Sequence, residues 1–379
     1  MQRKKLLVLP GLFPKFKGDA TGIFVLDYID CVKHYCDTTV LFLRLFGEPG
    51  LRHEEINGIK VVRYCLAKQT PLLKLLKPIL YILLHRKGIA LAKQLDRPDV
   101  IHAHGAPLNG ALALKLKKIF NAPVVITEHT GPFSKLTKIF FTRFATKKTI
   151  EACNVFLTVS NDLKMQVLAS GIKPKCALVS FNPVDTTLFA INSNTPLSER
   201  KRISFCARLE DYKGGLRVVK AYSLVKEKLE GFKLCIIGNG PEEALIKKFI
   251  LENNLTNNVE MIGKAVKSDI ADVYNRTSFF VFPSEHETFG LVIAEAMACG
   301  LPVIVGNETA PKEIVRESDG ILITPKNVNE IADAMVKMKD KLSDYNSEKI
   351  RQGIVERFGF ESFGKFLNKV YDDAIISNK

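Results

Sequence analysis

Two glutamates separated by seven residues are the strongest candidates for chemistry in this chain. Glu287 lies in a polar turn after an apolar strand, and Glu295 lies on the following helix, within SEHETFGLVIAEAMACG over residues 284–300. That helix is apolar nearly all round, so the Glu295 carboxylate needs hydrogen-bond donors or a raised pKa. The sugar hydroxyls of a bound nucleotide would supply donors, and the helix start near Glu287 favours a phosphate. The spacing alone fits equally well a helix-capping Glu287 and a Glu295 paired with an internal cation.

Two cations five residues apart follow an earlier predicted strand. Arg208 and Lys213 lie in RLEDYKG, directly after the apolar run over residues 202–207. A guanidinium and an ammonium at this spacing can clamp a diphosphate, because both donate charge-assisted hydrogen bonds to anionic oxygens. The alternative is a pair of solvated surface cations.

Glycine turns follow two further strands. Gly238 and Gly240 lie in IIGNGPE, but Glu243 occupies the place of the third glycine that a dinucleotide fingerprint requires. No NAD site is therefore predicted. Gly22 lies in GDATGIF, over residues 18–24, after the opening strand. Taken alone, this loop fits a plain turn as well as a ligand-binding one.

Histidines stand at the ends of two other predicted strands. His129 lies in VITEHTG, and His102 and His104 lie in DVIHAHG. A histidine at a strand end is more often structural than functional. The functional alternative for His104 is that it lines the cleft that binds the acceptor. For His104 the two roles stand about even.

Short apolar runs alternate with helical segments along the chain, which is typical of parallel α/β architecture. In the first half, strands are predicted over residues 4–9, 39–43, 60–64, 100–103, 123–127, 155–159 and 177–181. In the second half, they are predicted over residues 202–207, 233–237, 259–262, 279–282, 302–305 and 320–323.

The polar stretch NSNTPLSER, over residues 192–200, predicts a linker between two domains. We expect a first Rossmann-like domain over residues 1–190 and a second over 191–358, with a cleft between them. Residues 359–379 carry apolar side chains at helical spacing, so we expect an amphipathic helix there that packs back on the first domain.

The segment around Glu287 and Glu295, ETFGLVIAEAMACGLPVI, resembles the E-x7-E signature of family 4 retaining glycosyltransferases. That resemblance implies the GT-B fold, in which two Rossmann-like domains face each other across a deep cleft. The Arg208 loop resembles the family's G-R-L-x-x-x-K-G, with Ala207 in place of the glycine. The Gly238 turn resembles its G-x-G-P, and His129 resembles its T-x-H. The similarity extends over most of the chain.

The resemblance implies a role for each matching residue. Glu295 would bind the donor ribose, Glu287 would face the donor sugar, and His129 would hydrogen-bond the sugar or the nascent product. The implied catalytic residues are His129, Glu287, Arg208 and Lys213. The implied donor-binding residues are Gly22, Arg208, Lys213, Gly238, Gly240, Glu287, Phe289, Gly290, Leu291 and Glu295. His104 and Asp19 are acceptor candidates, and Thr21 replaces one glycine of the usual pair beside Gly22.

Cysteine content, apolar runs and charge indicate where the protein acts and which partners it favours. The eight cysteines form no C-x-x-C pair and no metal-ligand spacing, so we expect reduced thiols in a cytosolic protein. No apolar run approaches the ~20 residues of a membrane span. Residues 1–185 hold 28 basic and 13 acidic residues, so they carry all of the net charge of +15. This excess favours anionic partners such as lipid surfaces, phosphates or nucleic acid.

Two segments, residues 70–87 and 133–148, mix basic residues with Leu, Ile and Phe. Such segments are typical either of peripheral contact with an anionic membrane or of ordinary amphipathic helices with a basic outer face. The resemblance implies that the first domain binds the acceptor and the second the nucleotide-sugar donor. Because the charge is confined to this acceptor domain, we favour contact with the inner face of the cytoplasmic membrane or a lipid-linked acceptor.

The sequence and the resemblance together therefore predict a metal-independent hexosyltransferase without a cofactor, and the resemblance alone implies that the enzyme is retaining. It would move a sugar from a UDP- or GDP-linked donor to a saccharide or lipid-linked acceptor in polysaccharide or glycolipid synthesis. The chain has no D-x-D motif, and fixed cations would replace a metal at the diphosphate. The alternatives are an inverting or epimerising enzyme of the same fold, a soluble glycogen- or sucrose-type transferase, and a non-catalytic nucleic-acid-binding protein.

Overall fold

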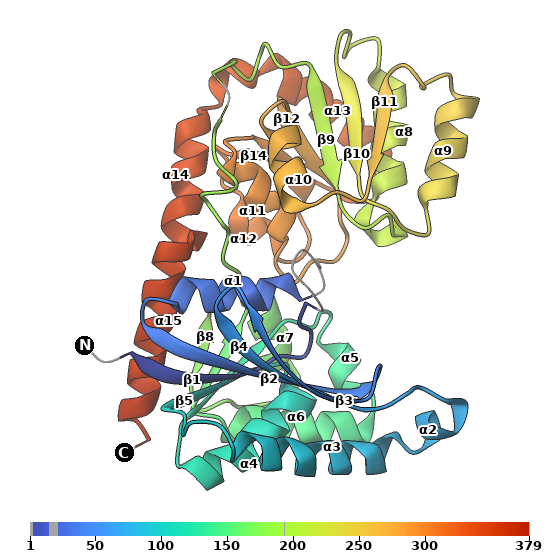
Figure 1. Cartoon of the computed structure of the whole chain (residues 1–379). Coiled ribbons are helices and arrows are strands. Elements are labelled where there is room, and N and C mark those ends of the chain that lie inside the picture. The colour runs from blue at the N-terminus through green and yellow to red at the C-terminus, as the bar shows by residue number, and fades with distance from the viewer. Residues whose placement is uncertain (1–2, 15–21, 193, 379) are drawn as a thin grey trace. The chain divides into compact units, whose positions relative to one another are not determined.

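The computed structural model describes residues 3–14, 22–192 and 194–378, and these fold into two compact units. Unit 1 comprises Met1–Phe181 and Phe363–Lys379, and unit 2 comprises Asn182–Ser362. Each unit is a sheet of mostly parallel strands covered by helices (Figure 1).

Unit 1 contains an eight-stranded sheet in the order β3-β4-β2-β1-β5-β6-β7-β8. Its strands are β1 (Lys4–Leu9), β2 (Cys36–Phe46), β3 (Gly50–Ile56), β4 (Ile59–Ala67), β5 (Val100–His104), β6 (Val124–Glu128), β7 (Val155–Thr158) and β8 (Ala177–Val179). The order reverses between β1 and β5, which pair in parallel, so a crevice is expected at the carboxyl ends of these two strands.

The helices of unit 1 connect these strands and cover both faces of the sheet. They are α1 (Ile23–Val32), α2 (Pro71–Leu75), α3 (Lys77–Ala92), the turn η1 (Ala106–Gly110), α4 (Ala111–Phe120), α5 (Ser134–Thr137), α6 (Phe140–Ala152), α7 (Asn161–Ala169) and α15 (Phe360–Ile376). Helices α3, α4 and α6 lie side by side on one face of the sheet, and α1 lies on the opposite face (Figure 1).

The edge strand β3 was missed from the sequence. It pairs antiparallel with β4 through a tight turn at Asn57 and Gly58, both with positive φ. Asn-Gly is the strongest short-range hairpin signal. The mostly polar strand GLRHEEI lacks an apolar run, because its side chains are largely exposed at the sheet edge.

Unit 2 contains a six-stranded parallel sheet in the order β11-β10-β9-β12-β13-β14. Its strands are β9 (Arg202–Cys206), β10 (Lys233–Ile237), β11 (Val259–Gly263), β12 (Phe279–Phe282), β13 (Val303–Gly306) and β14 (Gly320–Ile323). Its helices are η2 (Asp211–Lys213), α8 (Gly215–Val225), α9 (Glu243–Glu252), α10 (Lys267–Tyr274), α11 (Leu291–Ala298), α12 (Pro311–Ile314), α13 (Val328–Asp340), η3 (Leu342–Asp344) and α14 (Ser347–Phe358). Here the order reverses between β9 and β12.

The carboxyl-terminal helix α15 packs into unit 1, as its amphipathic pattern suggested. Phe363 meets the Tyr28 ring edge-on at 4.7 Å, and Lys4 forms a 2.8 Å ion pair with Asp372. Gly364 is required at the crossing with α1, because a Cβ there would lie 2.1 Å from the Cys31 carbonyl oxygen. The helix therefore contributes to the core of unit 1.

All thirteen strands predicted from the sequence are present, and their ends differ from the predicted ones by at most three residues. The predicted linker behaves differently from a free connector. Asn192 donates its N–H to the Asn275 side chain, and the Arg200 guanidinium donates to the Thr195 and Thr277 carbonyls. These bonds fix the stretch to unit 2, whose first residue is Asn182 rather than the predicted 191.

Candidate functional site

In unit 2, the predicted cations and carboxylates lie on two loops that flank the reversal of strand order. The loop after β9 carries Arg208 and leads through η2 to α8, and the loop after β12 carries Glu287 and leads to α11. Neighbouring parallel strands β9 and β12 bring these loops together at the carboxyl edge of the sheet. This is where open α/β sheets bind ligands.

The two loops are joined by a short ion pair between predicted site residues. Lys213 Nζ lies 2.5 Å from Glu287 Oε1, with both side chains mostly buried. The Glu285 N–H donates to the Tyr212 carbonyl at 2.9 Å, which links the loop backbones. The ammonium also lies over the Tyr212 ring at 5.0 Å, so it is fixed in place by several contacts.

Arg208 differs from Lys213 in its exposure. Its side chain is 74% exposed and forms a 2.7 Å ion pair with Glu210 in the same loop. Exposed pairs of this kind contribute little stability. The guanidinium can therefore exchange its carboxylate for another anion at low cost.

Arg217, on the first turns of α8, is a residue that the sequence did not single out. It lies 3.0 Å from Glu285 and 3.5 Å from Asp211, so it ties both loops to α8. Its side chain is largely buried, and Lys326 approaches the other oxygen of Glu285 at 3.0 Å. No sequence motif pointed to Arg217, because 68 positions separate it from Glu285 and only the fold brings the two residues together.

Glu295 is buried in the second turn of α11, as predicted. Burial, with a smaller contribution from the nearby Glu295 carboxylate, raises the pKa of the Cys206 thiol to about 12. Burial is the main cause that raises the pKa of Tyr274, and the Glu295 carboxylate is one of the smaller causes. Since Cys206 is the last residue of β9, the Glu295 carboxylate lies near the carboxyl end of that strand.

The start of α11 is shaped by glycine and phenylalanine. Gly290 has φ of 100°, which favours glycine, and leads directly into the helix at Leu291. The Phe289 side chain is buried and meets the Phe358 ring edge-on at 5.4 Å. The Phe289 side chain is therefore used in packing, and any contact of Phe289 and Gly290 with a ligand would be made by their backbone.

The turn at Gly238 and Gly240 supports the cation loop. A Cβ on Gly238 would lie 1.8 Å from the Ala207 carbonyl oxygen, and one on Gly240 would lie 2.6 Å from that of Leu209. The Leu209 N–H donates to the Asn239 carbonyl at 2.9 Å. The two glycines thus allow the turn to hold the backbone on either side of Arg208.

In unit 1, the three predicted histidines form a row at the carboxyl ends of β5 and β6. His104 Nδ1 lies 2.9 Å from His129 Nε2, and the His102 and His104 rings stack at 4.5 Å. His102 hydrogen-bonds the hydroxyls of Thr127 and Tyr371 at 2.7 and 2.8 Å. His102 therefore has a structural role within the core.

Burial keeps these histidines neutral. Desolvation lowers the pKa values of His102 and His129 to about 3 and that of His104 well below its usual value, with the neighbouring histidines adding to the effect at His102 and His104. His104 Nε2 is buried and has no hydrogen-bond partner within the described part of the chain.

Glu128, which the sequence did not single out, positions His129. Its Oε1 accepts from the N–H groups of His129 and Thr130 at 3.0 and 2.9 Å, and its Oε2 accepts from that of Ala106 at 2.9 Å. The Glu128 side chain is fully buried at the end of β6. The segment TEHTG shows a glutamate beside His129, but the hydrogen-bond partners of that glutamate could not be predicted from the sequence.

Gly22 opens α1 with φ of 71°, and a Cβ there would lie 2.5 Å from the Leu12 carbonyl group. The position therefore requires glycine for packing. The Phe24 ring lies 4.6 Å from that of His129, which places the start of α1 beside the histidine row. The predicted acceptor candidate Asp19 lies outside the described residues.

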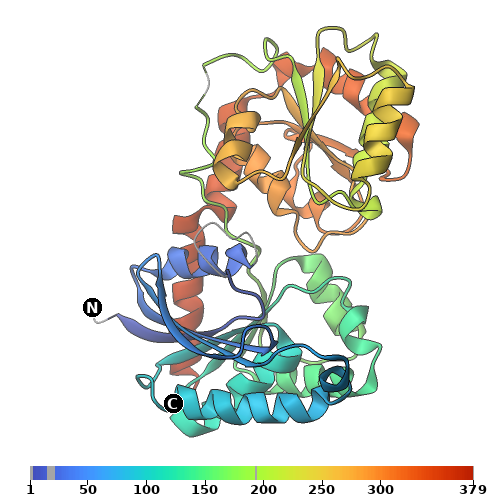
Figure 2. The same cartoon turned by 45° about the vertical axis from the view of Figure 1, so that its right-hand side comes forward.

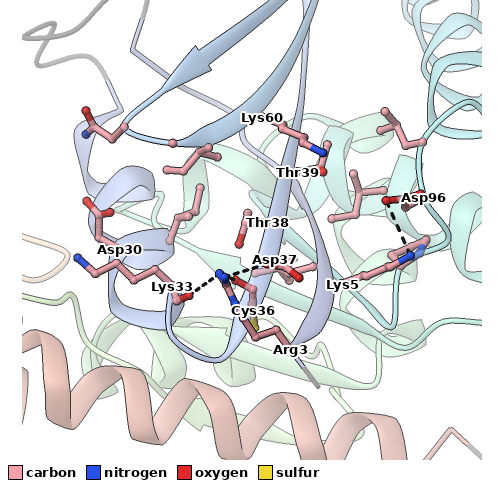
Figure 3. A pocket seen from close by; sticks show the side chains of 18 residues that line it. Arg3, Lys5, Asp30, Lys33, Cys36, Asp37, Thr38, Thr39, Lys60 and Asp96 are labelled. Carbon is pink, nitrogen blue, oxygen red and sulfur yellow. Dashed lines mark hydrogen bonds and ion pairs between the residues drawn. The ribbon is translucent and has the colours of Figure 1, made fainter. Parts of the chain in front are cut away.

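Two of the cavities described in unit 1 lie at opposite edges of its sheet. One of about 320 Å³ is lined by Arg3, Lys5 and Lys60 at the amino ends of the strands (Figure 3). Its cations are partly neutralised, because Arg3 pairs with Asp37 and Lys5 with Asp96. It lies away from the histidine row.

The other cavity, of about 340 Å³, lies at the carboxyl edge between α3 and η1. It is lined by polar side chains that include Arg44, Gln69, His85 and Asn109. Among the residues that the model places, no helix is long and apolar enough to cross a membrane, and no cluster of metal-ligating side chains is found.

Two models of glycosyltransferase families match consecutive parts of the chain. Residues 32–188 match the family model Glycosyltransferase Family 4, and residues 189–351 match Glycosyl transferases group 1. The chain belongs to the family 4 glycosyltransferases. The carboxyl-terminal match contains the Lys213–Glu287 pair and Glu295, so both glutamates of the signature fall within it.

Similar proteins include bacterial family members. N-acetyl-alpha-D-glucosaminyl L-malate synthase of Bacillus anthracis is 24% identical over 77% of this chain and 79% of its own length. The phosphatidyl-myo-inositol mannosyltransferase of Propionibacterium freudenreichii is 24% identical over 70% of this chain and 68% of its own length.

Solved structures show the GT-B fold. Sucrose-phosphate synthase from Thermosynechococcus elongatus superposes with a TM-score of 0.78 at 18% identity, over 99% of this chain and all of that one. Anabaena HepE in complex with UDP superposes with a TM-score of 0.74 at 17% identity, over 97% of this chain and all of that one. The chain is thus a glycosyltransferase of GT-B fold.

Proposed function

We propose that this glycosyltransferase takes a hexosyl group from a UDP- or GDP-linked sugar and transfers it, with retention, to a saccharide or lipid-linked acceptor. The Lys213–Glu287 pair at the junction of the β9 and β12 loops carries the proposal. It places an ammonium and a carboxylate together beside the start of α11. A diphosphate needs the cation and the helix start, and a sugar hydroxyl needs the carboxylate.

Each part of the donor is given its own group at the carboxyl edge of the unit 2 sheet. Glu295 of α11 would accept hydrogen bonds from the ribose hydroxyls. Arg208 and Lys213 would bind the diphosphate, with Arg208 leaving Glu210 to do so. Glu287 would accept from a hydroxyl of the donor sugar while it still orients Lys213.

Negative charge develops on the diphosphate as the bond between its oxygen and the anomeric carbon breaks. Lys213 and Arg208 would stabilise this charge, and cations fixed in advance do so without reorganising. The acceptor hydroxyl would form the new bond on the same face. Its proton would pass to the departing phosphate oxygen, so no carboxylate nucleophile and no metal is required.

His129 would bind a hydroxyl of the sugar as a neutral donor. Buried unpaired N–H groups are rarer than unpaired acceptors, so we infer that the unpartnered His104 Nε2 carries no proton. His104 Nδ1 then donates to His129 Nε2, which leaves the His129 proton on Nδ1. In this form His129 offers a hydrogen-bond donor across the physiological pH range.

A thermal-shift screen against UDP-, GDP-, ADP- and CMP-sugars, with and without a chelator, tests the proposal. We expect one donor to raise the melting temperature equally under both conditions, since ligand binding stabilises only the folded state. A requirement for added metal would remove the role given to the fixed cations. No stabilisation by any nucleotide sugar would remove the proposed donor class.

A further inference from the structure

The outward face of α3 is apolar, which is unusual for a helix on a protein surface. Ile79, Ile82 and Leu83 recur at helical spacing and are 56%, 60% and 44% exposed. Arg86 and Lys87 continue the same face one turn later. Surface helices normally present polar residues to water on this side.

These side chains are not needed for the core of unit 1. The opposite face of α3 already supplies Leu80 and Leu84, which pack with Leu45 of β2. Gly88 continues that inner face, where a Cβ would lie 2.5 Å from the Leu43 side chain. The exposed residues are therefore additional to a packed interface that is already complete.

Helix α6 and the turn before α3 show the same combination. Ile139 and Phe144 are 61% and 62% exposed at the start of α6, and Leu75 at the end of α2 is 80% exposed. Residues 70–87 and 133–148 contain nine basic residues and no acidic one. The basic residues are Lys74, Lys77, Arg86, Lys87, Lys135, Lys138, Arg143, Lys147 and Lys148.

Topology brings the two groups to one edge of unit 1. Helices α3, α4 and α6 lie side by side on one face of the sheet (Figure 2). Strands β4 and β6 both run parallel to the rest of the sheet, so α3 and α6 both begin at its carboxyl edge. Leu108, 39% exposed in η1 before α4, lies between them along the layer, and His129 follows β6 at the same edge.

We propose that this surface, comprising the exposed apolar and basic side chains of α2, α3, α5 and α6, docks unit 1 on an anionic lipid bilayer. Interfacial helices bury aliphatic and aromatic side chains at the headgroup boundary, while flanking lysines and arginines bind anionic headgroups. An acidic protein partner would be attracted by the charge alone. The apolar residues amid a cluster free of acidic residues favour a lipid surface.

Vesicle co-sedimentation tests the proposal on the full chain. We expect binding to phosphatidylglycerol-containing vesicles, little binding to pure phosphatidylcholine vesicles, and weaker binding at high salt. The triple variant Ile79→Ser, Ile82→Ser, Phe144→Ser should bind anionic vesicles at least about tenfold more weakly, because each side chain loses apolar area that the interface would bury.

A matched control is available in unit 2. Leu224, Leu245 and Leu251 are 60%, 56% and 65% exposed, close to the values of the three docking residues. The Leu→Ser triple variant at these positions should bind anionic vesicles like the wild type. Circular dichroism melting of both variants shows whether either has lost its fold.

Equal sedimentation of the docking variant and the control would overturn the proposal. So would a wild-type dimer in size-exclusion chromatography that the docking substitutions dissociate, since this result would make the surface a contact between two copies. The nucleotide-sugar thermal shift should be the same in both variants. Its loss in the wild type would contradict the proposed donor, whereas loss of vesicle binding alone would contradict only the docking surface.

Discussion

Replacing Lys213 by methionine separates the stability and the catalytic role of its ion pair with Glu287. The substitution keeps an apolar stem and removes the charge that lies 2.5 Å from the Glu287 carboxylate. The side chains are 18% and 11% exposed, so the remaining carboxylate is only partly solvated. Breaking a fully buried pair costs about 3–5 kcal/mol, and residual solvent contact reduces this to roughly 1–3 kcal/mol.

Lys213→Met should also lower kcat, and this loss is separate from the loss of folding stability. A fixed donor lost from the site of developing charge costs about 10²–10³ in kcat. The double variant Lys213→Met, Glu287→Gln should recover most of the stability, because neither charge is left unpaired. It should not recover kcat, since the leaving diphosphate would still lack its cation.

Urea unfolding and nucleotide release from the preferred donor sugar measure the two quantities. Lys213→Arg serves as the control, because it keeps the charge. A single variant whose kcat falls by less than about threefold would refute the assignment of Lys213 to the leaving group. A double variant that regains activity would show that the pair matters only for folding.

Three further predictions concern other parts of the two units. Glu295→Ala should weaken nucleoside diphosphate binding by about 10- to 100-fold in calorimetry, because the ribose hydroxyls lose their acceptor. Burial lowers the pKa of His102 in the folded chain to about 3. The unfolded chain therefore binds more protons below pH ~6.5. As the pH falls toward 3, this group should lower the free energy of unfolding by up to about 1.4 kcal/mol per pH unit. His102→Gln should reduce that slope in urea unfolding between about pH 6.5 and about pH 4. Gly238→Ala should destabilise by more than about 2 kcal/mol in the same assay, whereas Gly171→Ala, with no atom near its Cβ position, should cost about 1 kcal/mol.

Local sequence patterns predicted most of the fold because they reflect burial on the same segment. Strands β1, β10 and β12 have the predicted bounds, since continuous apolar runs are typical of strands covered on both faces. Strand β3 was missed because an exposed edge strand lacks such a run. Unit 2 begins before the predicted boundary, because Arg351 of α14 donates to the Thr186 and Phe189 carbonyls, a distant contact that composition does not reveal.

The candidate site could be predicted where a motif is contiguous and not where the fold assembles it. Glu287 and Glu295 stand on one turn and helix, so their spacing was readable. The contact of Lys213 with Glu287 joins residues 74 positions apart. Arg217 and Glu128 were missed for the same reason, since each acts by holding backbone or side chains that only the folded chain brings near.

A crystal structure of the chain with the nucleoside diphosphate of its preferred donor tests the central claim most directly. The account predicts the diphosphate within hydrogen-bonding distance of Lys213 and Arg208, with the ribose on Glu295. A nucleotide bound elsewhere would contradict it, such as one in the cavity lined by Lys5 and Lys60 at the amino ends of the unit 1 strands (Figure 3).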